Sequence, residues 1–177
     1  MSLRAVFGQG FAVVLASAAA TSLQSGPRPI NFARPLNKAD AAVVDRVRAG
    51  AARRLQNPEC AKVLTEFADA EGRTLERRLE PWGLSAADYL RVVDFRDGSS
   101  VPRCEQRSVQ LVAVPGLLPV FLCPDPRVPR SKLAAVERTD PDLAEFMVIH
   151  EMLHTLGLGE NPPSTFEITE RVRKRCQ

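Results

Sequence analysis

The chain has 177 residues, of which 45% are hydrophobic and 25% are charged, and its formal net charge at pH 7 is +3. This length and hydrophobic fraction are enough for one domain with a core of its own. The small excess of positive charge excludes the strongly basic composition of a nucleic-acid-binding protein. One basic cluster near the C-terminus has no aromatic neighbours to stack on bases, and we interpret it as the solvated end of a helix (Arg171, Arg173, Lys174 and Arg175).

The N-terminus has the pattern of a cleaved signal peptide, predicted to span residues 1–20. Arg4 precedes an apolar, Ala-rich run over residues 5–20, which closes on small residues at the spacing that signal peptidase recognises. The alternative is a transmembrane anchor, but the run falls short of the roughly 20 strongly hydrophobic residues that a span needs. Residues 21–36 are expected to form an extended leader, either inert or a propeptide, ahead of a single domain over residues 37–177. We therefore predict a secreted or periplasmic protein without a membrane segment after cleavage.

The four cysteines are typical of an oxidising compartment rather than of a zinc cluster. They are Cys60, Cys104, Cys123 and Cys176, and no two of them lie within a few residues of each other. We expect two disulfides. Three pairings are open, and we favour Cys104–Cys123, which would join the open end of a hairpin, with Cys60–Cys176, which would tie the two ends of the domain.

The first half of the predicted domain has a helical pattern. Asn37 is suited to cap a helix with apolar residues at helical spacing, and Asn57-Pro58 begins a second helix that places Cys60 on its buried face. A short helical segment over residues 73–80 and another helix beginning at Ser85 follow. The sequence therefore predicts a helical N-terminal half.

The character of the chain then changes to strands. Residues 108–114 and 118–123 are rich in branched side chains and flank Pro115-Gly116, which predicts a β-hairpin. Six prolines over residues 115–141 predict that much of the following connection is irregular. The hairpin edge over residues 118–122 is expected to be able to align an extended peptide as an added strand.

The C-terminal part predicts two further helices. Asp140-Pro141 has the order of an N-cap and first helical residue, and Gly157 and Gly159 are expected to end that helix. Residues 164–167 read Ser-Thr-Phe-Glu, a capping box for a last helix. The predicted fold class is α+β: N-terminal helices, a small sheet with a hairpin, a motif-bearing helix and a short C-terminal helix.

The motif is His150-Glu151-Met-Leu-His154, which reads H-E-x-x-H on the predicted helix. Histidines four residues apart lie one turn above each other, so both imidazoles can reach one Zn²⁺. Glu151 lies beside the first ligand and is expected to act as general base. These are the only two histidines in the chain. The plainer alternative is a core helix whose histidines only form hydrogen bonds. Against it, two buried histidines without partners would carry a high cost in free energy.

A third protein ligand is expected to be a carboxylate. The stretch over residues 150–160 resembles the metzincin motif H-E-x-x-H-x-x-G-x-x-H, with Gly157 at the glycine position and Glu160 at the third ligand position. It departs from that motif in two ways, because glutamate replaces the third histidine and no methionine follows to form a Met-turn. The last thirty residues also resemble small secreted bacterial proteins of the zincin type, and the resemblance implies a metallopeptidase-like domain. The alternative third ligand is Glu167, or with less support Glu170, on the last helix.

These residues predict a zinc-dependent hydrolase, most simply a peptidase, in which Glu151 transfers the proton of a zinc-activated water to the leaving amine. A peptide or protein is the expected substrate, and a monomer the expected state. Tyr89, Arg127 or Arg130 could stabilise the oxyanion, although packing within its helix is the plainer role for Tyr89. The alternatives are a non-catalytic secreted binding module with a structural zinc site, and a helical structural domain without metal.

Overall fold

The computed structural model describes residues 34–177. The predicted signal peptide over residues 1–20, and residues 21–33 of the predicted leader, lie outside the described residues. The elements follow one another as α1 (Lys38–Leu55), α2 (Pro58–Ala61), α3 (Val63–Glu66), α4 (Leu75–Leu79), the 3-10 turn η1 (Glu80–Trp82), α5 (Ala86–Val92), β1 (Asp94–Asp97), the 3-10 turn η2 (Pro102–Glu105), β2 (Leu111–Ala113), β3 (Pro119–Leu122), α6 (Lys132–Thr139), α7 (Pro141–Thr155) and α8 (Thr165–Cys176). This is the α+β class that the sequence predicts.

The expected caps begin the N-terminal helices. Asn37 accepts a hydrogen bond from the Asp40 amide at the start of α1, and Asn57 accepts one from the Glu59 amide at the start of α2. Ser85 caps α5 in the same way. The segment predicted over residues 73–80 continues as η1 and ends at Gly83, whose φ of 62° lies in the left-handed region that glycine tolerates.

The sheet has three strands in the order β1-β3-β2. β2 and β3 form the predicted antiparallel hairpin, and β1, which the sequence reading missed, pairs with β3 in parallel. β3 is therefore paired on both sides, so residues 118–122 do not offer the free edge that we expected. The free edge on the hairpin side belongs to β2.

Helix α6 lies in the proline-rich connection, much of which was expected to be irregular, and was not predicted from the sequence. The helix begins at Lys132, and the Ser131 side chain caps it by accepting a hydrogen bond from the Ala134 amide. The last proline before it is Pro129, so no proline interrupts the helix.

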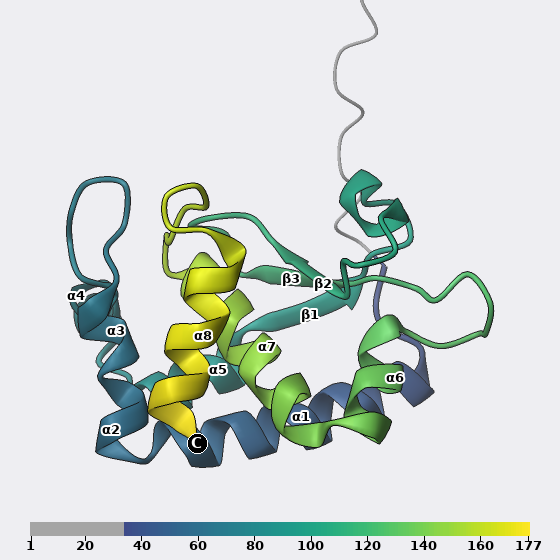
Figure 1. Cartoon of the computed structure of the whole chain (residues 1–177), viewed down its shortest axis with the longest axis horizontal. Helices are drawn as coiled ribbons and strands as arrows, with labels where there is room; N and C mark the ends of the chain where they lie inside the picture. The colour runs from purple at the N-terminus through teal and green to yellow at the C-terminus, as the bar shows by residue number, and fades with distance from the viewer. Residues whose placement is uncertain (1–33) are drawn as a thin grey trace, which may run out of the picture.

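Helix α7 lies at the centre of the molecule and contacts α1, α6, α8, β2 and β3 (Figure 1). Its C-terminal half is buried on most faces, since the sheet covers one side and helices cover others. The turn between β2 and β3 reaches the end of α7, where the Gly116 amide donates a hydrogen bond to the His154 carbonyl at 2.9 Å. The hairpin is thereby fixed against the turn of α7 that carries the motif.

Both favoured disulfides are present. Cys60–Cys176 joins α2 to the end of α8, and Cys104–Cys123 joins η2 to the residue that follows β3. These two bonds indicate an oxidising compartment. Across residues 34–177, none of the helices combines the length and apolarity required to cross a bilayer.

Candidate metal site

The two histidines of the motif converge on one point. His150 and His154 project from successive turns of α7, both are 4% exposed, and their Nε2 atoms lie 3.0 Å apart. The Nδ1 atom of His154 lies 2.7 Å from the Leu158 carbonyl oxygen. Because a carbonyl only accepts, this Nδ1 carries the proton and Nε2 presents a lone pair. The Nδ1 atom of His150 lies 3.0 Å from the Thr169 hydroxyl, which is able to accept in the same way.

Outer hydrogen bonds of this kind orient histidines that bind metal ions. If both Nδ1 atoms carry their protons, two Nε2 lone pairs face each other in a buried space. Burial and, to a smaller extent, the neighbouring His154 lower the pKa of His150 to about 4, although the Glu160 carboxylate acts in the opposite direction. A proton therefore does not bridge the pair at neutral pH, whereas a cation would satisfy both nitrogens.

Glu160 completes the group after a reversal of the chain. α7 ends at Thr155, and Gly157 has a φ of 108°, which favours glycine and lets the chain turn back beside the helix. One carboxylate oxygen of Glu160 then lies 3.6 Å from Nε2 of His154 and 4.0 Å from Nε2 of His150.

The Glu160 carboxylate is held from two sides. The Thr165 hydroxyl donates to Oε1 at 2.6 Å, and the Arg103 guanidinium donates to Oε2 at 3.2 Å. Partial burial raises the pKa of Glu160, but these hydrogen bonds outweigh burial and the pKa lies below its ordinary value. The carboxylate is therefore charged and oriented at neutral pH.

The three ligand atoms fit a tetrahedral metal ion. They all lie within 4.8 Å of one another. Ligands at about 2.0–2.1 Å from Zn²⁺ in tetrahedral geometry are separated by about 3.3 Å, close to the distances above. Two imidazoles and one carboxylate are a donor set that zinc accepts, and they leave its fourth position open.

Glu151 lies on the open side of this group. It lines a cavity of about 110 Å³ whose other walls are Arg103, Leu111, Val112, Ala113, Pro115, His154 and Glu160. Burial raises the pKa of the Glu151 carboxyl to about 7, against a hydrogen bond from the Ala113 amide that lowers it. A carboxyl with this pKa exchanges protons readily near neutral pH, which suits a general base.

The other residues singled out in the sequence lie elsewhere. Glu167 forms the predicted capping box with Ser164, and Glu170 pairs with Arg173. Tyr89 is buried in the core and donates a hydrogen bond to Thr155, so the structure does not bring it to the cavity. Neither Arg127, which pairs with Asp125, nor Arg130 lines the cavity.

Three residues of the site escaped the sequence reading. Arg103 and Thr165 hold Glu160, and Thr169 contacts His150. The two threonines lie four residues apart on the last helix, a spacing that could have marked them as one face turned toward the motif. Arg103 carries no such signal, because it lies 57 positions from Glu160.

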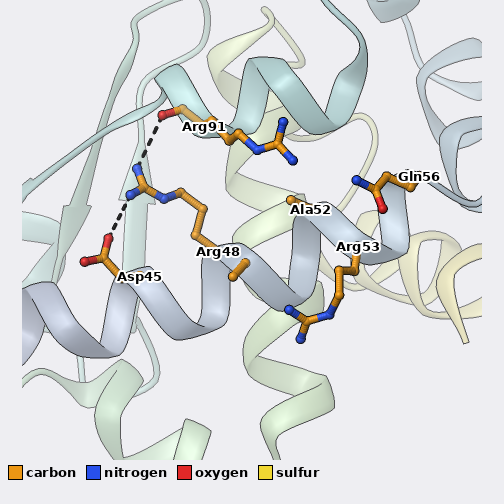
Figure 2. Close-up of a pocket in the computed structure, with 7 residues that line it drawn as sticks. Asp45, Arg48, Ala52, Arg53, Gln56 and Arg91 are labelled. Atoms are coloured by element: carbon orange, nitrogen blue, oxygen red, sulfur yellow. Dashed lines mark hydrogen bonds and ion pairs between the residues drawn. The ribbon is translucent and has the colours of Figure 1, made fainter.

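Larger clefts exist, but they lack such a set of groups. One cleft, of about 460 Å³, lies beside α1. Figure 2 shows its lining residues, among which Arg48 donates hydrogen bonds to the Asp45 carboxylate and to the Arg91 carbonyl. Neither histidine of the chain lies there, and its Arg48 charge is already paired. Within residues 34–177, the one group that could hold a metal ion is therefore His150, His154 and Glu160.

Comparison of the chain with protein families, with curated proteins and with solved structures found no match.

Proposed function

We propose that the chain is a secreted or periplasmic zinc-dependent hydrolase, and specifically a peptidase. The observation that carries this proposal is the convergence of His150, His154 and Glu160, with Glu151 beside them in the same cavity. A metal group with an open position beside a carboxyl of raised pKa is the arrangement of hydrolytic rather than purely structural zinc sites. The two disulfides support an extracytoplasmic location.

Zinc bound at this site would polarise a substrate carbonyl and lower the pKa of water. Glu151 would take the proton of the attacking water and return it to the leaving amine. The Ala113 amide keeps the Glu151 carboxylate in place for both steps. An extended peptide would add to the free edge of β2, whose residues Leu111–Ala113 line the cavity.

The first test is the zinc content of the disulfide-intact protein, measured by elemental analysis. We expect one zinc ion per chain in the wild type and a marked loss in Glu160→Ala. Glu167→Gln is the matched control, because glutamine preserves the capping box and removes the competing carboxylate. Loss of zinc in Glu167→Gln but not in Glu160→Ala would transfer the third ligand to Glu167. Absence of zinc from the wild type after remetallation would overturn the proposal.

The second test separates turnover from metal binding. Glu151→Gln should keep its zinc and lose cleavage of a peptide library, because the amide cannot accept the proton. Cleavage that survives in Glu151→Gln would contradict the role of Glu151.

A structural zinc site in a binding module is the second candidate, and the small volume of the cavity favours it. In that case the wild type would bind zinc and cleave no member of the library.

A further inference from the structure

Arg103 is the one cationic side chain that lines the cavity beside the candidate metal site. Its side chain is 57% exposed, so the guanidinium lies at the rim and remains open to solvent. A guanidinium has five N–H donors. Within residues 34–177, Arg103 uses its donors for a single hydrogen bond, to the Glu160 carboxylate. Most of its donors therefore remain available to a group that enters the cavity.

The segment that carries Arg103 is fixed by a disulfide and by hydrogen bonds. The Cys104–Cys123 disulfide attaches η2 to the end of β3. The buried Lys132 ammonium donates to the carbonyls of Cys104, Gln106 and Val109, at 2.8, 2.6 and 3.0 Å. These bonds hold the backbone on the C-terminal side of Arg103.

The N-terminal side of the segment is held as closely. The Gly98 amide donates to the Leu122 carbonyl at 2.8 Å, and a Cβ at Gly98 would lie 2.5 Å from that oxygen and 2.8 Å from the Cys104 sulfur. Val101 and Cys104 belong to a small second core with Phe121 and Cys123. The long side chain of Arg103 thus projects from a rigid base, which lowers the entropy lost on binding a ligand.

The charge of the cavity points to an anionic ligand. A divalent ion would balance the two carboxylates, Glu160 and Glu151, so Arg103 gives the cavity rim a net positive charge. Arginine binds carboxylates through two parallel N–H donors, a geometry that its spare donors allow. From these observations we propose that Arg103 is a substrate-binding residue that recognises a carboxylate next to the scissile bond. This inference rests on the proposed hydrolase function and names its substrate class, peptides with a carboxylate at that position.

The test uses two zinc-binding probes that differ only in charge. Succinic acid monohydroxamate carries a hydroxamate that chelates zinc and a free carboxylate, and its amide counterpart lacks the charge. Both are titrated by calorimetry into the zinc-loaded wild type, Arg103→Gln and Arg107→Gln. Arg107 is the matched control because it is an exposed arginine close in the chain that lines a different cleft. Zinc content is measured on the same samples.

The wild type should bind the carboxylate probe about tenfold more tightly than the amide, the effect of a charge-assisted hydrogen bond at a partly exposed site. All titrations are run at saturating zinc, because the loss of the Arg103 hydrogen bond to Glu160 is expected to weaken metal binding. Under these conditions Arg103→Gln should bind both probes equally, whereas Arg107→Gln should keep the preference. Equal affinity in the wild type, no binding of either probe, or a preference that survives in Arg103→Gln would overturn the inference alone. Absence of zinc would overturn the proposed function and this inference together.

The source of the carboxylate is distinguished by competition between acetylated dipeptides and the hydroxamate. A free C-terminal alanine is compared with its amide, and a C-terminal glutamate amide with the glutamine amide. A preference for the free terminus would identify the recognised carboxylate as the C-terminus of the peptide. A preference for glutamate would identify it as an acidic side chain. The absence of both preferences would contradict carboxylate recognition.

Discussion

At the residue scale, Glu151 has an unfavourable electrostatic position in the metal-free fold. Burial raises its pKa from an ordinary 4.5 to about 7. A carboxyl with a raised folded-state pKa favours folding below the unfolded value, and that contribution is lost as the pH rises through the folded value. The free energy of unfolding is therefore expected to fall between pH 4.5 and pH 7. The shift in the Glu151 pKa corresponds to a loss of about 3 kcal/mol over that range.

We therefore expect Glu151→Gln to stabilise the metal-free protein at pH 8 by up to about 3 kcal/mol, and to change little at pH 4.5. The measurement is the free energy of unfolding from urea titrations with chelator at both pH values. The other ionisable groups are the same in both proteins, so the comparison at each pH subtracts their contribution. The control is Glu76→Gln at an exposed position of α4. An equal effect of Glu151→Gln at the two pH values would contradict the buried charge.

Thr169 offers a second residue-scale prediction, because its hydroxyl contacts Nδ1 of His150 at 3.0 Å. Outer hydrogen bonds of this kind contribute roughly 10- to 100-fold to metal affinity. Thr169→Val, which keeps the shape of the side chain, should weaken zinc binding by about tenfold in a competition assay with a chromophoric chelator. Thr139→Val, at an exposed threonine of α6 far from the motif in sequence, should leave the affinity unchanged. Equal affinities for Thr169→Val and the wild type would remove Thr169 from the site.

At the scale of elements, the two disulfides close loops of very different length. Cys60 and Cys176 are separated by 116 positions, and Cys104 and Cys123 by 19. Loop-closure entropy predicts stabilisation of about 5 kcal/mol for the long loop and about 3 kcal/mol for the short one. Paired Cys→Ala variants should lower the free energy of unfolding in that order, with Cys60→Ala/Cys176→Ala the less stable. The reverse order in guanidinium titrations would show that local packing outweighs loop closure.

The elements that the sequence predicts well carry their signals locally. The caps at Asn37, Ser85 and Ser164 each lie within three residues of the amide that they satisfy, so short-range chemistry fixes those helix starts. The H-E-x-x-H motif likewise lies within one helix, and Glu160 follows directly after the chain reversal at Gly157. These features explain why the metal group could be predicted before the fold was known.

The elements that escaped prediction depend on distant partners. β1 reads Asp-Phe-Arg-Asp, with a single apolar residue, and becomes a strand only because β3, some 25 positions later, pairs with it in parallel. That same pairing makes β3 central and leaves the edge to β2. α6 was hidden by the density of prolines, although Ser131 marks its start. Arg103 escaped prediction for the same reason, because its position next to the site cannot be read from local spacing. For Tyr89 the plainer expectation of packing is the one that the structure shows.

At the scale of the whole molecule, the candidate site joins parts of the chain that lie far apart in the sequence. Its ligands lie on α7 and the following loop, their supporting groups lie on η2 and α8, and β2 holds Glu151. A metal ion that binds only the folded state shifts the folding equilibrium by mass action. Zinc should therefore stabilise the fold as a unit rather than one helix.

The magnitude of this coupling can be predicted. At a free zinc concentration of 100 times Kd, the stabilisation is about 2.7 kcal/mol, which for a domain of this size raises Tm by roughly 8 °C. The measurement is calorimetric melting of the disulfide-intact protein with buffered zinc and with chelator. Glu160→Ala should lose most of the rise at the same zinc concentration, whereas Glu167→Gln should keep it, because its carboxyl serves only the cap of α8. A rise in Tm of equal size in Glu160→Ala would mean that zinc stabilises the protein through other groups. No rise in Tm of the wild type would show that zinc binding does not stabilise the fold.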